Sequence, residues 1–310
     1  MTTFVYVPPY APPAPPVAPF GGYGSVWTGA DGSVWDLTDP DGGVFMTNQG
    51  VRGLLRPEYT RFTSKSAGVA GSRHRGSRAE ERSVYWPVFV FSDAGSQEWV
   101  ELDRAFARSF DPDVPGFWTV TQPSGEKRYL SCRLVDDGGA ADEIDPVRAG
   151  WRVYGINLVA TDPYWYGEPI SSTWSGIVGA GRSTFPIRFN DRNFRRKASS
   201  TLGTVTMTNP GDVDAWPVLT IEGGPATDFE FTVGDRTIAG SVTLNEGDVL
   251  VIDTDPRRQS TYLNGTRVRG LLSEANFAPI PAGKDRELTI NVNPSGTVTA
   301  TIAPRYNRAW

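Results

Sequence analysis

The sequence contains one cysteine, one histidine and three methionines in 310 residues. A lone cysteine, Cys132, excludes an intrachain disulfide, and one cysteine with one histidine excludes the zinc sites that these residues build. His74 lies in an arginine-flanked segment with no third group to orient it, which argues against a Ser/His/Asp triad. Cys132 lies between Leu130 and Leu134 in an expected strand, so we expect a small buried hydrophobic residue there.

Long apolar runs and a secretory signal are also absent. No run approaches the ~20 residues that cross a bilayer, so we expect no membrane insertion and a chain that stays in the cytoplasm of the host until assembly. The net charge of −5 gives no general attraction to nucleic acid. Aspartate pairs such as Asp136 and Asp137 stand beside glycine and favour turns, although carboxylates that meet only in the fold stay open as a hydrolytic pair. We therefore expect no enzyme, no catalytic residue, no cofactor and no metal.

Turn-forming and aromatic residues are plentiful. The sequence has 34 glycines, 25 prolines and 12% aromatic residues, which indicates a folded chain with many turns and few helices. A length of 310 residues exceeds one ordinary core and predicts two domains. We expect an extended arm (1–22), an α+β domain (23–170), a basic linker (171–200) and a β-sandwich (201–310).

The arm is rich in proline between residues 4 and 20, which favours an extended polyproline II conformation without internal hydrogen bonds. Such a segment is typical of a disordered tail. The aromatic residues Tyr6, Tyr10 and Phe20 are unusual in purely solvating tails and indicate instead an arm that docks on a neighbouring subunit. Both interpretations stay open.

The α+β domain contains one amphipathic helix, expected from Ser96 to Ser109 with Ser96 as the N-cap. Its apolar residues share one side and predict that it covers one face of a sheet; they are Trp99, Leu102, Phe106 and Phe110. Strands are expected at 82–92, 117–121, 128–135 and 151–161, after a β-meander at 23–28, 33–37 and 43–47. Pro87 cannot donate a backbone hydrogen bond, which places its strand at an edge or a bulge and makes Pro87 a candidate contact.

A long connection, expected without secondary structure, spans residues 52–82 and is rich in cations, including Arg73, Arg75 and Arg78. It lacks the interleaved aromatics of a nucleic-acid platform. We favour an inter-subunit contact with the acidic stretch 136–145 of another copy, and a merely solvated loop stays as the alternative. From residue 201, short strands at regular spacing predict the sandwich, and Asn264-Gly265 predicts a type I′ hairpin turn.

The order and spacing of several segments resemble the distal tail protein family of long-tailed bacteriophages, in particular the minor tail proteins of phages of actinobacteria. The segments are Gly50 to Leu55, Trp99 to Phe110, Pro115-Gly116-Phe117-Trp118, Ser124-Gly125-Glu126, Cys132-Arg133 and Asp162-Pro163-Tyr164-Trp165. The resemblance implies a virion protein of the tail tip. It implies a belt-like domain that closes into a hexameric ring, with Trp165 among the candidate contacts.

The same resemblance implies partners above and below the ring: the tail tube protein, a tail-associated hub protein, and tape-measure or receptor-binding proteins. It also implies that the sandwich is galectin-like. Because sites are grafted on folds, a second hypothesis is a carbohydrate-binding adhesion module with Trp174, Trp216 or Tyr262 as the sugar platform, although the sequence around Trp216 favours a core role. Self-association through the first domain would separate the two hypotheses.

Overall fold

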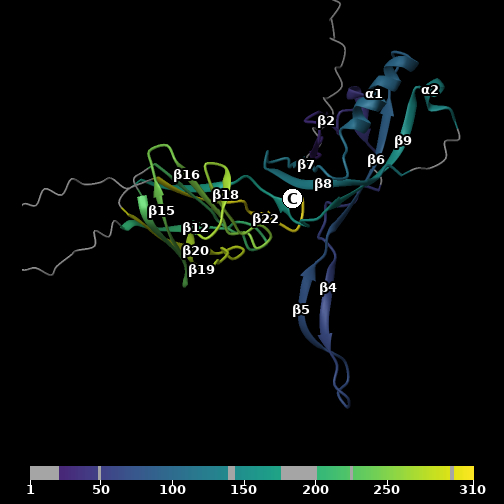
Figure 1. The fold of residues 1–310 in the computed structure, drawn as a ribbon. Coiled ribbons are helices and arrows are strands. Elements are labelled where there is room, and N and C mark those ends of the chain that lie inside the picture. Colours follow the sequence, from purple (N-terminus) through teal and green to yellow (C-terminus); the bar gives the residue numbers. More distant parts are fainter. Residues whose placement is uncertain (1–20, 48–49, 139–143, 176–200, 224–225, 294–296) are drawn as a thin grey trace, which may run out of the picture.

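The computed structural model describes residues 21–47, 50–138, 144–175, 201–223, 226–293 and 297–310 (Figure 1). The described chain forms two β-rich domains and one projecting hairpin, which confirms the expected mainly β fold with two domains. Each domain has its own cluster of buried apolar side chains.

The first domain is built on an antiparallel sheet in the order β2-β1-β7-β8-β9-β6-β3. Alternate residues of β6 point inward, so Val84, Trp86 and Val88 are almost fully buried. The Trp86 ring lies edge-on to Trp27 at 5.3 Å and to Trp118 at 5.0 Å, so the two ends of the curved sheet share one core. The strands are β1 (Gly24–Thr28), β2 (Val34–Asp36), β3 (Val44–Met46), β6 (Arg82–Phe91), β7 (Gly116–Thr121), β8 (Lys127–Asp136) and β9 (Trp151–Ala160).

The expected helix is confirmed as α1 (Ser96–Arg108), with Trp99 and Phe106 buried against the sheet. The predicted N-cap is wrong. Gly95 occupies that position with φ 137° and no side chain caps the helix, so Ser96 is the first helical residue. Only glycine adopts this backbone conformation readily, and the turn into the helix selects it. A second, short helix, α2 (Pro146–Ala149), is capped by Asp145.

The expected β-meander holds for two strands only. β1 pairs with β2, whereas β3 pairs with β6 at the opposite edge, with Phe45 facing Phe89. The 3₁₀ turn η1 (Pro40–Gly42), followed by Gly43 at φ 75°, redirects the chain there.

Pro87 lies at a local edge, as predicted. β3 pairs with β6 only at residues 88–90, and on the same side the N–H groups of Phe91 and Tyr85 donate to Gly43 and Arg52. The missing N–H of Pro87 therefore falls just beyond the end of β3, where no strand partner needs it.

Residues 59–79 form a hairpin of β4 (Tyr59–Ser64) and β5 (Arg73–Ala79), so the expectation of an unstructured connection is wrong. The hairpin is a separate two-stranded sheet that extends away from the domain (Figure 1). Its strands have no apolar alternation, because neither face packs on a core, and this removed the sequence signal for strands.

The second domain is a β-sandwich, as expected, with sheets in the orders β11-β21-β13-β16-β17-β18 and β12-β20-β14-β15-β19. Asn264 and Gly265 have φ 49° and φ 77°, which confirms the type I′ turn. The first sheet comprises β11 (Ile170–Ser175), β13 (Val218–Glu222), β16 (Val249–Asp253), β17 (Ser260–Leu263), β18 (Thr266–Val268) and β21 (Thr297–Ile302). The second comprises β12 (Thr201–Thr208), β14 (Ala226–Val233), β15 (Arg236–Leu244), β19 (Leu272–Ala275) and β20 (Asp285–Asn293).

The chain crosses between the domains twice, and both crossings move the expected boundaries. β11 lies where the linker was expected to begin, yet it pairs with β21 in the sandwich. The rest of that linker, residues 176–200, lies outside the described residues. After β21 the chain returns to the first domain, where β22 (Arg305–Tyr306) pairs with β10 (Trp165–Tyr166) and Ala309 is buried in the first core. The last six residues therefore complete the first domain.

Candidate functional site

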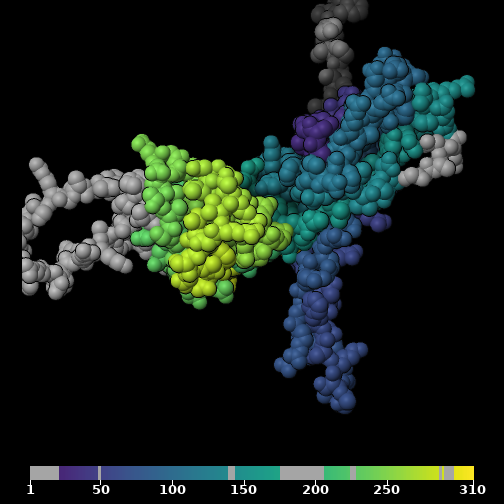
Figure 2. All heavy atoms as spheres, viewed as in Figure 1, coloured from purple at the N-terminus to yellow at the C-terminus, as the bar shows by residue number. Residues whose placement is uncertain are grey.

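The hairpin of β4 and β5 is the most prominent surface feature, and Figure 2 shows it standing clear of both domains. Residues 59–79 contain no acidic side chain. Arg75 donates to Ser64 Oγ at 2.9 Å across the two strands, and at the base Arg78 pairs with Glu80 at 3.0 Å. We call this exposed, positively charged element the cationic hairpin; its cations are Arg61, Lys65, Arg73, Arg75 and Arg78.

The base of the hairpin is tied to the C-terminal segment. The Tyr59 hydroxyl donates to Asn307 Oδ1 at 2.8 Å. Beside it, the buried guanidinium of Arg82 donates to the carbonyl oxygens of Gly53, Leu55, Pro163 and Asn307. Burial lowers the pKa of Arg82 to about 10, which still leaves it charged at neutral pH. One side chain therefore fixes three chain segments.

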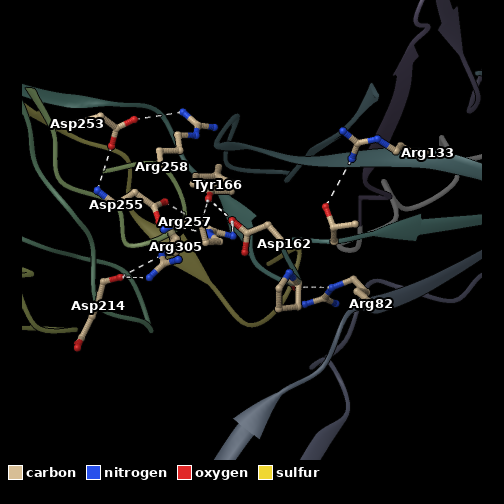
Figure 3. Close-up of polar contacts among 12 residues, drawn as sticks. Arg82, Arg133, Asp162, Tyr166, Asp214, Asp253, Asp255, Arg257, Arg258 and Arg305 are labelled. Carbon is tan, nitrogen blue, oxygen red and sulfur yellow. Dashed lines mark hydrogen bonds and ion pairs between the residues drawn. The ribbon is translucent and has the colours of Figure 1, made fainter. Parts of the chain in front are cut away.

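A cluster of charged residues joins the two domains (Figure 3). Asp162, just before β10, forms an ion pair of 2.6 Å with Arg257 of the sandwich, and Tyr166 donates its hydroxyl proton to the same Asp162 oxygen. Arg257 also pairs with Asp255 at 2.8 Å. Burial, reinforced by the Asp162 charge, raises the pKa of Tyr166 to about 12. The cluster therefore fixes one domain against the other through a charged contact rather than an apolar one.

A cavity of about 610 Å³ opens beside this cluster, between the domains. Its lining mixes aromatic rings with charges of both signs, and includes Phe117, Tyr129, Arg133, Trp216, Asp253 and Arg258. No group of three or more His, Cys, Asp or Glu side chains that could hold a metal ion occurs within the described ranges. No helix of the described part of the chain is long and apolar enough to cross a membrane.

The three aromatic residues considered for a sugar platform occupy separate places. Trp174 packs against the sandwich core from β11, and Tyr262 lies on β17, four strands along the same sheet. Trp216 is half-buried at the domain junction, where it lines the cavity instead of the core that the sequence favoured. This arrangement does not favour the carbohydrate-binding alternative.

The interface candidates from the sequence are distributed unevenly. Arg73, Arg75 and Arg78 are exposed residues of β5 in the hairpin. Pro87 and Trp165 are buried, and the Trp165 indole donates to the carbonyl of Gly53 at 3.2 Å, so both belong to the interior of the isolated chain. Tyr6, Tyr10 and Phe20 lie outside the described residues.

No structural role was predicted from the sequence for Arg82, Asp162 or Arg257. The burial of Arg82 could have been predicted, because it alternates with Val84 and Trp86 along one strand and its side chain therefore lies on the same inward face. The pairing of Asp162 with Arg257 left no such signal, since the two residues come from different domains.

Residues 210–310 match the family model described as the C-terminal domain of siphovirus-type tail components. The crystal structure of the Dit protein (gp 19.1) of phage SPP1 is similar over 92% of this chain and 99% of that one, with a TM-score of 0.61 at 15% identity. A chain of the phage P2 baseplate in its activated conformation with Ca is similar over 91% of this chain and 98% of that one, with a TM-score of 0.50 at 14% identity.

No curated protein sequence matches the chain. Because these structures are only 14–15% identical to this chain, they show that the fold is shared and nothing about residue roles. The sequence match covers most of the second domain and the C-terminal segment that returns to the first, and the likeness in fold extends over both domains. Residues 210–310 are therefore similar to the C-terminal domain of siphovirus-type tail components, and over its two domains the chain has the fold of the SPP1 Dit protein.

Proposed function

We propose that this chain is a structural subunit of a phage tail tip, and that six copies close into a ring that joins the tail tube to the central hub. The observation that carries the proposal is the tail-component sequence match in a chain whose whole fold is that of a distal tail protein. A chain in the phage P2 baseplate shares the fold, which supports a place in the same kind of assembly. A role without catalysis is supported by the match to a model of tail components.

A ring needs two different surfaces on each subunit that fit together. The cationic hairpin is one candidate. The acidic segment around α2 is the other; its described acidic residues are Asp136, Asp137 and Asp145, and all three are exposed. In Figure 1 the hairpin and α2 point away from each other, so the hairpin of one copy would meet the acidic segment of the next. Such a head-to-tail contact closes a ring when the rotation between neighbours is right.

The remaining partners follow from a place at the tail tip. The ring would contact the tail tube protein on one side and a tail-associated hub protein on the other. Tape-measure or receptor-binding proteins would attach to this assembly, and the finished location would be the virion. The sandwiches would project outward from the ring, where receptor-recognition components would attach to them.

The test is the solution mass of the full chain, measured by light scattering across a salt series. We expect a mass near six subunits at low salt and a shift to smaller species as salt screens the hairpin contact. Arg73→Glu with Arg75→Glu should abolish the oligomer. The matched control, Arg267→Glu with Arg269→Glu, makes the same charge change at exposed positions of the sandwich and should leave it intact. A monomer under all conditions would contradict the proposal.

A further inference from the structure

The outer face of the first sheet, opposite to α1, carries an exposed cluster of aromatic rings. Residues of β6 alternate between the two faces, so Phe89 and Phe91 point outward while Val88 and Val90 point into the core. Phe89 stacks on Trp151 at 5.7 Å and lies 5.4 Å from Phe45. We call this set the outer aromatic face; it consists of Phe45, Phe89, Phe91, Trp151 and Val153.

This face remains accessible in the described structure. Trp151 is 42% exposed and Val153 is 53% exposed, and the three phenylalanine rings are half-buried. All five side chains are apolar. A contiguous exposed apolar patch of this kind marks a binding surface more often than an accident of composition.

The chain itself contains a segment of matching chemistry. Residues 1–20 include seven prolines and four aromatic residues and have no charged side chain. Proline-rich segments have a preformed extended conformation, lose little entropy on binding, and are recognised by surfaces lined with aromatic rings. We propose that the N-terminal arm of a neighbouring copy packs on the outer aromatic face, with Tyr6 and Tyr10 against the rings. This inference rests on the proposed self-assembly.

Strand register gives the length of one route along the sheet from the arm to the outer aromatic face. The arm ends next to Gly24, which pairs with Thr121 at the turn between β7 and β8. From Lys127 to Asp136 along β8, and from its partner Asn157 to Trp151 along β9, the path covers about 50 Å at ~3.3 Å per residue. An extended arm gains ~3.1 Å per residue, so its Tyr10 reaches about 40 Å from Gly24 along the strands. Along this route Tyr10 falls short of Trp151, whereas the curved sheet brings Trp27 of β1 within 5.3 Å of Trp86 of β6 and shortens the direct distance. The subunit-exchange experiment therefore decides between the arm of a neighbour and the arm of the same copy.

The experiment places the photoreactive residue benzoylphenylalanine at Tyr10 of the full chain. Two preparations are mixed, one with the photoreactive residue and one with an affinity tag, and are irradiated after subunit exchange. We expect a covalent product between the two chains, with the modified peptide lying within 82–91 or 151–160. Trp151→Ser with Val153→Ser in the tagged chain should reduce that product at least fivefold. The matched control is Phe117→Ser, which removes another exposed aromatic residue outside the outer aromatic face and should leave the yield unchanged.

Three outcomes would overturn the inference: a product formed only within one chain, a modified peptide elsewhere in the chain, or an undiminished yield with the double variant. Light scattering on the same samples separates this result from the proposed function. An oligomer without the expected product would overturn the arm contact and leave the tail-tip assembly standing. A monomer would overturn both.

Discussion

The guanidinium of Arg82 donates a hydrogen bond of 2.9 Å to the backbone carbonyl of Asn307, which follows it by 225 positions in the sequence. The same side chain also binds carbonyls at Gly53, Leu55 and Pro163. The C-terminal segment, the base of the hairpin and the start of the aromatic segment 162–166 therefore share one charged anchor. The contribution of this anchor to the free energy of unfolding can be measured.

Arg82→Met should lower the free energy of unfolding of the first domain by about 3–5 kcal/mol, because it leaves several buried carbonyl groups without a donor. Urea unfolding followed by tryptophan fluorescence measures the change. Arg78→Met, at an exposed position on the hairpin, serves as the control and should change stability little. Equal effects of the two substitutions would show that Arg82 is not an anchor.

The ion pair between Asp162 and Arg257 should couple the domains. In a double-mutant cycle with Asp162→Asn and Arg257→Gln, we expect a coupling energy of about 1 kcal/mol, a value that allows for the 44% exposure of the Arg257 side chain. The matched cycle on Asp253 and Arg258, which are 3.6 Å apart with the arginine 73% exposed, should give a smaller value. The opposite ranking would mean that the Asp162 contact does not fix the domain orientation.

Alkaline pH should destabilise the fold through Tyr166. The unfolded chain loses the phenol proton near pH 10, whereas the pKa of Tyr166 in the folded protein is raised to about 12 by burial and by Asp162. The unfolded state therefore becomes charged first, and the free energy of unfolding falls between pH 10 and pH 12, by about 3 kcal/mol at most. Urea unfolding at each pH measures the loss, and Tyr166→Phe should make the decline shallower. A decline of the same steepness in this variant would assign it to other groups.

Gly116 tests how tightly the tryptophan core is packed. A Cβ atom there would lie 2.3 Å from two ring atoms of Trp27, so Gly116→Ala forces the ring to move and should cost about 1–3 kcal/mol. Gly24→Ala is the control in a paired strand of the same sheet, where the nearest atom, Thr121 Cβ, lies at 3.5 Å. Thermal unfolding of both variants gives the comparison. If the two melt alike, the core adapts more easily than its geometry indicates.

The parts of the fold that were predictable have local signals. The helical spacing of Trp99, Leu102 and Phe106 predicted α1. Asn264-Gly265 predicted the type I′ turn between β17 and β18. In both cases the residues that determine the local structure lie within a few positions of each other. The hairpin of β4 and β5 has no such cause. Its strands are held by backbone hydrogen bonds and show no apolar face, so composition alone suggested a loop.

The contacts at the candidate site were unpredictable for a different reason. Arg257 and Asp162 are brought together by the way the two domains meet, and Tyr306 reaches β10 only after the chain has passed through the whole sandwich. Contacts between residues this far apart in the chain leave no pattern in the local sequence from which they could be predicted. Trp165, which stood among the candidate contacts with the resemblance, is instead fully buried in the first core, where its burial depends on strands distant in sequence.

The return of β22 to the first domain has a consequence for how the protein is made. Synthesis proceeds from the N-terminus, and most domains of a nascent chain fold while later ones are still being added. Here the partner strand of β10 and the buried Ala309 are synthesised after the whole sandwich. The first domain cannot close until these residues have been made, so premature termination anywhere in the sandwich would leave both domains incomplete. Only chains that extend past Ala309 would present a complete surface for assembly.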